Sequence, residues 1–166
     1  ILQAALRVTR EGVAKIILVG NILEIQALAD KEGIDLIGME LIDPATSSLK
    51  PEFAQELFVL RGKKGMTLDA AHQAVLDPLC FANMMVRLGH ADGSVSGAVR
   101  TTGDVVRNAI QIIGTDKNFK LVSSFFFFFF CQPFHTLKGG LIFSDCGLVI
   151  NPDATELSEI AMAAAD

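Results

Sequence analysis

The residues best suited to chemistry lie in the stretch "ADGSVSGAVRTTGDVVRNAIQIIG", which spans 91–114. We expect a strand over 94–99 to lead into a helix over 101–113. Free backbone N–H groups and the positive end of the helix dipole would then favour an anion such as phosphate. The small polar residues of this turn are Ser96, Gly97, Thr101 and Thr102. Such turns are common in α/β proteins, so they are weak evidence for an anion site by themselves.

Two arginines stand where an anion would need positive charge. Arg107 lies within two turns of the start of the same helix, and Gly97 would let a ligand approach the backbone. Arg61 ends another expected helix, in "LFVLRGKKG", where Lys63 and Lys64 follow it. A solvated positive cluster beside the negative end of a helix dipole is the more common explanation for Arg61. A contact to the anion is the alternative.

Alternating strands and helices must position these residues. Apolar periodicity, caps and glycine stops predict helices over 1–12, 21–33, 51–65, 67–76, 77–89, 101–113 and 151–166, and strands over 15–20, 37–43, 94–99, 120–129 and 140–150. This alternation is typical of an α/β protein with a largely parallel sheet. The first helix has no N-cap, so we expect the chain to start inside a helix and to be an interior piece of a longer protein.

Six consecutive phenylalanines occupy 125–130. In a strand flanked by other strands, a continuous apolar run is typical of burial on both faces. Buried layers normally mix large and small side chains, and an unfolded run of this kind favours aggregation. Two interpretations therefore stay open: the letters are the gene's own, or some of them are not. A membrane span is excluded, because polar residues and a proline interrupt the uncharged stretch over 121–137.

Charge and cysteine content narrow the class of protein. The net charge of −5, with no basic cluster beyond Lys63 and Lys64, argues against a nucleic-acid surface. Three cysteines are too few for a disulfide framework, which favours a reducing cytosol. Cys131, His135 and Cys146 do not have a recognised zinc-ligand spacing, so an ordinary His and buried thiols are the better interpretation.

Two aspartates have a structural and a functional interpretation. Asp145 follows an apolar strand and has the right chemistry for a base, although a carboxylate that stabilises a turn is more common there. Asp104 lies in the first turn of its helix, where a negative charge interacts favourably with the dipole. We favour the structural interpretation for both residues.

Several separated motifs resemble the phosphotransacetylase (phosphate acetyltransferase) family. They are "LVGN", "IDP", "LRGKKGMTLDAA", "MMVRLGHADGSVSGAVRTTGDVVRNAIQIIG", "LVSSFF" and "GGLIFSDCGLVINPDATELSEIA". They occur in the family's order and cover essentially all 166 residues. The resemblance implies a three-layer α/β/α fold of two domains, similar to isocitrate and isopropylmalate dehydrogenases. Most of the first domain would then be 1–114, and 115–166 would start the second.

The resemblance also implies an activity and its residues. The expected enzyme is cytoplasmic and homodimeric, needs no metal or redox cofactor, and interconverts acetyl-CoA plus phosphate with acetyl phosphate plus CoA. The family's active-site arginines fall on Arg61 and Arg107. Its substrate-binding residues fall on Ser96, Gly97, Thr101 and Thr102. The family's catalytic aspartate lies in a C-terminal segment outside this chain, so we expect the chain alone to be inactive. Many relatives have His at Arg100 and Pro at Asn108, so no role is transferred to these two.

Other functions remain as alternatives. A phosphate butyryltransferase differs only in a pocket for the acyl chain. A noncatalytic module that binds acyl-CoA, like the region fused to some malic enzymes, would regulate rather than react. A metal-dependent decarboxylating dehydrogenase would need clustered aspartates and a nucleotide loop, and neither is visible in the sequence.

Overall fold

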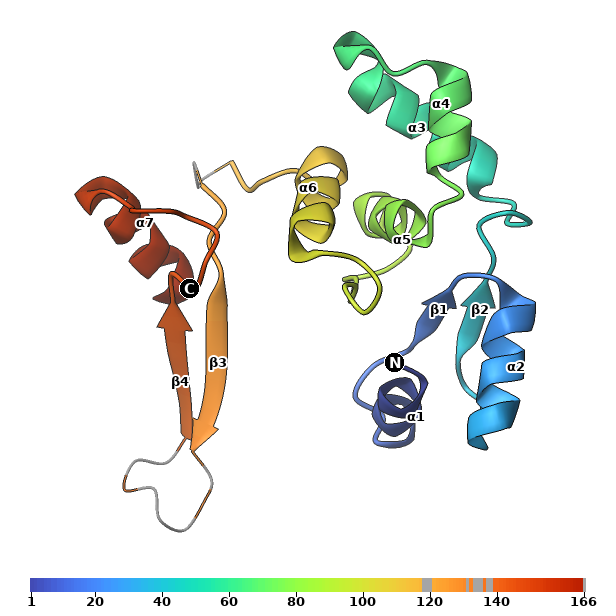
Figure 1. Ribbon diagram of the computed structural model, residues 1–166, viewed down its shortest axis with the longest axis horizontal. Helices are drawn as coiled ribbons and strands as arrows, with labels where there is room; N and C mark the ends of the chain where they lie inside the picture. The colour runs from blue at the N-terminus through green and yellow to red at the C-terminus, as the bar shows by residue number, and fades with distance from the viewer. Residues whose placement is uncertain (118–120, 131, 133–135, 137–138, 166) are drawn as a thin grey trace. The chain divides into compact units, whose positions relative to one another are not determined.

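The structure is a computed structural model that describes residues 1–117, 121–130, 132, 136 and 139–165. The chain forms two compact units, Ile1–Gly114 and Thr115–Asp166. Figure 1 shows the helices and strands of each unit. That these units are parts of two domains of a larger enzyme stays a prediction.

The first unit is mixed α/β. Its elements are α1 (Leu2–Arg10), β1 (Ile17–Val19), α2 (Ile22–Glu32), β2 (Glu40–Ile42), α3 (Lys50–Arg61), the 3-10 turn η1 (Gly62–Lys64), α4 (Leu68–Ala74), α5 (Pro78–Arg87) and α6 (Thr102–Ile112). Strands β1 and β2 pair in parallel, with Leu18 opposite Leu41. Helix α2 connects them, as a parallel pair requires. The two predicted strands and the helix between them are therefore confirmed.

Polar side chains at the helix starts explain where the helices begin. Asn21 accepts a hydrogen bond from the backbone N–H of Glu24 at 3.1 Å. Thr67 does the same for Ala70 at 3.1 Å, and Asp77 at the start of α5 accepts from the Leu79 N–H at 3.0 Å. Each cap satisfies a backbone donor that has no partner within the helix. Such caps lie within four residues of sequence, so the predicted helix starts at these positions are confirmed.

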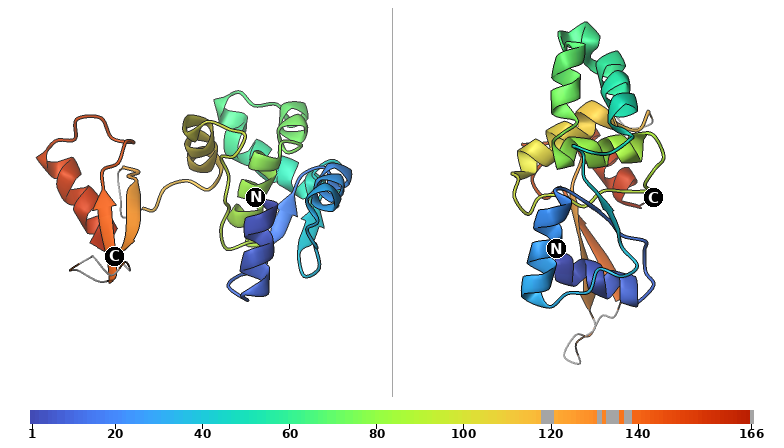
Figure 2. Two further views of the ribbon diagram at one scale, coloured as in Figure 1. Left: turned by 60° about the horizontal axis from the view of Figure 1, so that its bottom comes forward. Right: turned by 90° about the vertical axis from the view of Figure 1, so that its right-hand side faces the viewer.

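The main core of the first unit lies among α3, α4, α5 and the end of α6. Phe53 of α3 and Phe81 of α5 are fully buried, with ring centroids 4.8 Å apart. Met84 on α5 and Val75 after α4 are also fully buried. Helices α3 and α4 lie side by side (Figures 1 and 2), and α5 contacts α3, α6 and β1. Helix α5 therefore forms the centre of this unit.

Cys80 of α5 belongs to the same core. Its burial, with a smaller contribution from the charge of Asp77, raises the pKa of the thiol to about 12. The thiol is therefore neutral near pH 7 and serves as a packing group, as a buried free cysteine commonly does.

The predicted strand over 94–99 is wrong. The chain there is an exposed loop, and no strand within the described residues pairs with it. Val95 and Val99 are almost fully exposed. A strand requires a neighbour for its backbone N–H and C=O groups, and β-branched residues supply a preference for extended backbone but no partner.

The second unit contains β3 (Phe125–Phe130), β4 (Gly139–Ser144) and α7 (Ala154–Ala165). β3 and β4 pair antiparallel, with Phe127 opposite Ile142. The prediction of a largely parallel sheet is therefore wrong for these strands. The connection over 131–138 is shorter than the dozen or more residues that a parallel crossover needs.

The phenylalanine run forms the predicted strand, but its predicted burial on both faces is wrong. The side chains of Phe125 to Phe129 are between 46% and 67% exposed. Within the described residues the sheet has two strands, and α7 contacts β4. Alternate rings contact one another along the strand, with Phe127 and Phe129 centroids 4.5 Å apart. A two-stranded ribbon has too little neighbouring structure to cover both of its faces.

Helix α7 begins with a reciprocal pair of hydrogen bonds. The Asp153 carboxylate accepts from the Glu156 N–H at 2.8 Å, and the Glu156 carboxylate accepts from the Asp153 N–H at 2.9 Å. This is the capping-box arrangement. Of the two possible caps in the sequence, Asp153 and Thr155, it is Asp153 that makes this contact.

Replacing Phe81 by Ala in the full-length protein should lower the free energy of unfolding by about 3 to 5 kcal/mol, because it opens a cavity in the core around α5. Leu23→Ala is the control, since Leu23 is 76% exposed. It should change the free energy by less than about 0.5 kcal/mol. Urea unfolding followed by circular dichroism measures both, and equal effects would contradict this description of the core.

Candidate anion-binding site

The start of α6 is held by a two-way contact between Thr101 and Asp104. The Thr101 hydroxyl accepts from the Asp104 N–H at 3.2 Å and donates to the Asp104 carboxylate at 2.7 Å. The hydroxyl hydrogen of Thr101 is therefore used within the helix in this state. Thr102 is exposed, and within the described part of the chain the N–H groups of Thr102 and Gly103 have no hydrogen-bond acceptor. These two N–H groups are the donors available to an anion.

Arg107 lies one turn further along α6 and is 67% exposed. Its Nη1 donates to Asp104 Oδ1 at 3.3 Å. The hydrogen bond from Thr101 is the largest cause that lowers the pKa of Asp104, and the charges of Arg107 and Arg100 lower it further. Asp104 is thus a carboxylate that partly neutralises the candidate anion-binding arginine.

Ser96 and Gly97 lie in the exposed loop before α6. Gly97 has φ 122°, a backbone conformation that side chains rarely adopt. A Cβ added at Gly97 would meet no atom within 4 Å. The conformation rather than crowding therefore explains the glycine at this position.

Arg61 ends α3 and is half-buried. Its side chain makes no hydrogen bond or ion pair with any of the described residues. Lys63 and Lys64 follow in η1 and are exposed. The guanidinium of Arg61 thus carries a positive charge that no carboxylate neutralises within the described ranges. One of the six predicted residues, Arg61, lies at the end of α3. The other five lie in α6 or in the loop before it: Ser96, Gly97, Thr101, Thr102 and Arg107.

Sequence reasoning missed a network of polar side chains that connects α5 with α6 and with the loop before α6. Asn83 of α5 is 1% exposed. Its carbonyl oxygen accepts from the Ser94 hydroxyl at 2.8 Å, and its amide nitrogen donates to Asn108 Oδ1 at 2.7 Å. A polar residue inside the apolar stretch "CFANMMV" was the available indication.

The ion pairs of Arg100 and Arg87 were missed as well. Arg100 donates to Asp77 Oδ2 at 3.0 Å, which ties the loop before α6 to the cap of α5. Arg87 donates from Nη1 to the backbone carbonyl of Ile112 at 2.9 Å and pairs with Glu56 of α3 at 3.1 Å. Helix α5 is thus connected to both helices that carry candidate arginines.

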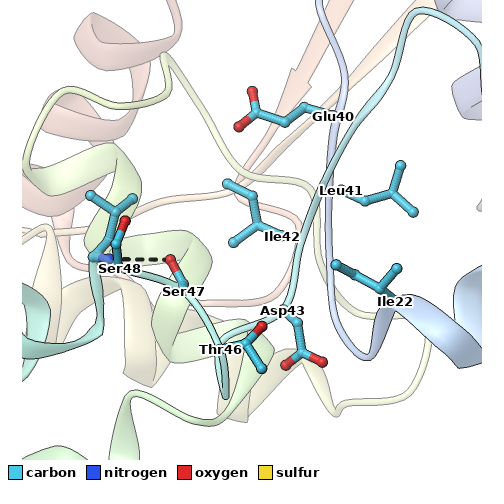
Figure 3. A pocket seen from close by; sticks show the side chains of 9 residues that line it. Ile22, Glu40, Leu41, Ile42, Asp43, Thr46, Ser47 and Ser48 are labelled. Atoms are coloured by element: carbon cyan, nitrogen blue, oxygen red, sulfur yellow. Dashed lines mark hydrogen bonds between the residues drawn. The ribbon is translucent and has the colours of Figure 1, made fainter.

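A separate open cavity of about 380 Å³ lies at the end of β2 (Figure 3). Its walls are formed by Ile22, Glu40, Leu41, Ile42, Asp43, Thr46, Ser47, Ser48 and Leu49. Asp43 accepts from the Ala45 N–H at 2.8 Å, and the Ser47 hydroxyl accepts from the Leu49 N–H at 3.3 Å. Both side chains therefore stabilise the local turn, and none of the six predicted residues lines this cavity.

The other candidates from the sequence are Cys131, His135, Cys146 and Asp145. Cys131 and His135 lie outside the described residues, and no cluster of possible metal ligands occurs within the described ones. Cys146 donates from its thiol to the carbonyl of Phe143 at 2.9 Å. Asp145 has φ 64° and a buried Oδ1 that accepts no hydrogen bond in the described part of the chain. No helix among the described residues is long and apolar enough to span a membrane.

The sequence profile of one family, described as Phosphate acetyl/butaryl transferase, matches residues 1–166. The chain therefore belongs to the phosphate acetyl/butaryl transferase family. The suspected resemblance is confirmed.

Individual relatives agree with this assignment. The chain is 43% identical to a phosphate acetyltransferase of Acetivibrio thermocellus over 99% of its own length and 49% of the relative's. It is 44% identical to a phosphate acetyltransferase of Paracoccus denitrificans, over 99% of its length and 48% of the relative's. The chain thus spans about half the length of these curated relatives.

Solved structures support the fold. The EutD phosphotransacetylase from Staphylococcus aureus superposes with a TM-score of 0.84 at 36% identity, covering 96% of this chain and 46% of that one. A phosphotransacetylase from Streptococcus pyogenes gives a TM-score of 0.82 at 34% identity, covering 96% of this chain and 47% of that one. The mixed α/β fold of the chain is therefore similar to that of phosphotransacetylases.

The contact at the start of α6 predicts a titration. Thr101→Val removes the hydroxyl that donates to Asp104, so the pKa of Asp104 should rise toward its ordinary value of about 3.9. Thr102→Val removes a neighbouring exposed hydroxyl that makes no such contact, and should leave the titration unchanged. Carboxyl-carbon NMR of Asp104 against pH measures both variants. An unchanged pKa in Thr101→Val would show that the hydroxyl does not stabilise the carboxylate.

Proposed function

We propose that this chain is the phosphate-binding part of a phosphate acetyltransferase, which interconverts acetyl-CoA and phosphate with acetyl phosphate and CoA. The observation that carries the proposal is the start of α6, where two backbone N–H groups without an acceptor among the described residues, the exposed Thr102 and Arg107 lie within two turns of helix. The names of the relatives support the same activity.

The phosphate would bind at the start of α6. The N–H groups of Thr102 and Gly103 supply neutral donors, and the guanidinium of Arg107 supplies a bidentate cation. Because Asp104 accepts from Nη1 of Arg107, the carboxylate and the phosphate compete for the charge of this arginine, although its other N–H donors remain available to the phosphate. Ser96 and Gly97 line the approach from the preceding loop, and Thr101 acts mainly by capping the helix.

Arg61 supplies the second positive charge in this proposal. The thiolate of CoA attacks the acetyl carbon of acetyl phosphate, a C–S bond forms, and the C–O bond to phosphate breaks. Negative charge then grows on the leaving phosphate oxygens, which Arg61 and Arg107 stabilise. The thiol proton passes to an aspartate base that the family resemblance places outside this chain. Holding both substrates together supplies the proximity contribution to the rate.

The domain architecture, cellular location, oligomeric state and cofactor requirement are part of the same proposal. We expect two domains with the three-layer α/β/α architecture of the isocitrate and isopropylmalate dehydrogenases, a cytoplasmic homodimer, and no metal or redox cofactor. The family description includes butyryl transfer, whereas the similar curated relatives carry the acetyl name. Acetyl transfer is therefore favoured over butyryl transfer, and no observation favours a noncatalytic module.

Phosphate-dependent release of CoA from acetyl-CoA tests the activity in the full-length protein. Arg107→Ala and Arg61→Ala should each lower kcat/KM for phosphate by about 10² to 10³-fold, the usual cost of removing one group that stabilises developing charge. Arg7→Ala is the matched control. Arg7 is an exposed arginine whose partner is Glu11 at 2.8 Å in α1, and its removal should leave kcat/KM within about twofold.

The outcomes separate the hypotheses. No release by the wild-type protein, with acetyl-CoA still bound, would favour the regulatory module. Release that survives in Arg107→Ala would remove this arginine from the phosphate site while leaving the activity itself established. Faster release from butyryl-CoA than from acetyl-CoA would favour the butyryltransferase.

A further inference from the structure

We propose that Asn83, which touches no substrate, is a positioning residue that aims Arg107 at the phosphate. This inference rests on the proposed function. It assigns a role to a buried amide that joins the two segments bearing the candidate phosphate contacts, namely the loop before α6 and α6 itself.

The burial of Asn83 is the first observation. Its side chain is 1% exposed, and it is the one buried polar or charged residue among the described residues. It lies in the apolar face of α5, beside the fully buried Met84. An amide in such a place costs free energy unless its polar atoms find partners. Both ends of the Asn83 amide have one, so the position is satisfied only when both neighbouring segments are in place.

The two partners of Asn83 are the second observation. Ser94 donates to its carbonyl oxygen at 2.8 Å, two residues before Ser96. Asn108 accepts from its amide nitrogen at 2.7 Å and is the immediate neighbour of Arg107. The amide therefore fixes one point of the loop and one point of the helix against the same side chain.

Helical geometry connects this anchor to the arginine. Successive residues of an α-helix are rotated by about 100° around its axis. Fixing Asn108 against α5 thus fixes the rotation of α6, which directs the adjacent Arg107 away from the core. The exposure of Arg107, at 67%, agrees with that direction. If Asn83 were lost, α6 could rotate or shift, and a displacement of about 1 Å at a reacting group is enough to lower the rate markedly.

Kinetics of the full-length enzyme test this role. Asn83→Leu keeps a similar volume and removes both hydrogen bonds, so KM for phosphate should rise about tenfold or more while KM for acetyl-CoA stays within about twofold. Met84→Ala is the control, because it disturbs the same buried helix and removes neither the hydrogen bond to Ser94 nor that to Asn108. It should lower thermal stability and leave the ratio of the two KM values unchanged.

A double-mutant cycle separates positioning from general destabilisation. In an Arg107→Ala background, Asn83→Leu should change KM for phosphate by less than about twofold, because the group that it positions is gone. An equal rise in both backgrounds, or an unchanged KM in Asn83→Leu alone, would overturn the inference and leave the proposed function intact. Absence of phosphate-dependent release by the wild-type enzyme would instead refute the proposed function.

Two milder variants serve if Asn83→Leu does not fold. Ser94→Ala removes the loop contact and Asn108→Ala removes the helix contact, and neither side chain is as buried as Asn83. Asn108→Ala should raise KM for phosphate by about threefold or more, and the rise should vanish in the Arg107→Ala background. Effects that persist there would count against positioning.

Discussion

The burial of α5 is the constraint on which the rest of the first unit depends. Phe81 and Met84 anchor this helix in the core. Arg87 at its end pairs with Glu56 of α3 and donates to the last turn of α6. Helix α3, which ends at Arg61, and helix α6, which carries Arg107, therefore both contact α5. Two positive charges on separate segments can act on one ligand only if such an element holds them.

The electrostatics of α6 follow from its sequence within a single turn. Thr101 caps the helix by accepting from the Asp104 N–H, and the Asp104 carboxylate in turn accepts from the Thr101 hydroxyl and from Arg107. One carboxylate therefore connects the helix start to the arginine. An exposed pair of this kind contributes little to stability, which makes it easy for a doubly charged anion to displace. The number of hydroxyl groups is therefore a poor guide to an anion site, because the Thr101 hydroxyl already donates its hydrogen to Asp104.

Local features of the fold were predictable and features that need distant partners were not. The caps at Asn21, Thr67 and Asp153 lie within a few residues of the donors they satisfy, so the sequence contains the whole interaction. The conformation of the exposed loop over 94–99 and the exposure of the phenylalanines depend on which strands lie beside them. The contact of Asn83 with Asn108 joins residues 25 positions apart. Hydrophobic periodicity does not indicate such a pair. Arg61 and Arg107 could be proposed as candidates because their positions on helices and the family motifs around them are visible in the sequence.

The hydrogen bonds of Asn83 with Ser94 and Asn108 also affect how the candidate site responds to pH and salt. Asparagine and serine carry no charge and do not titrate in the physiological range, and a hydrogen bond between neutral buried groups is little affected by dissolved salt. The exposed ion pairs of the same unit, such as that of Arg107, weaken as ionic strength rises. Acidification and high salt would therefore weaken the exposed ion pairs around the candidate site before they altered the relative placement of the loop and the helix.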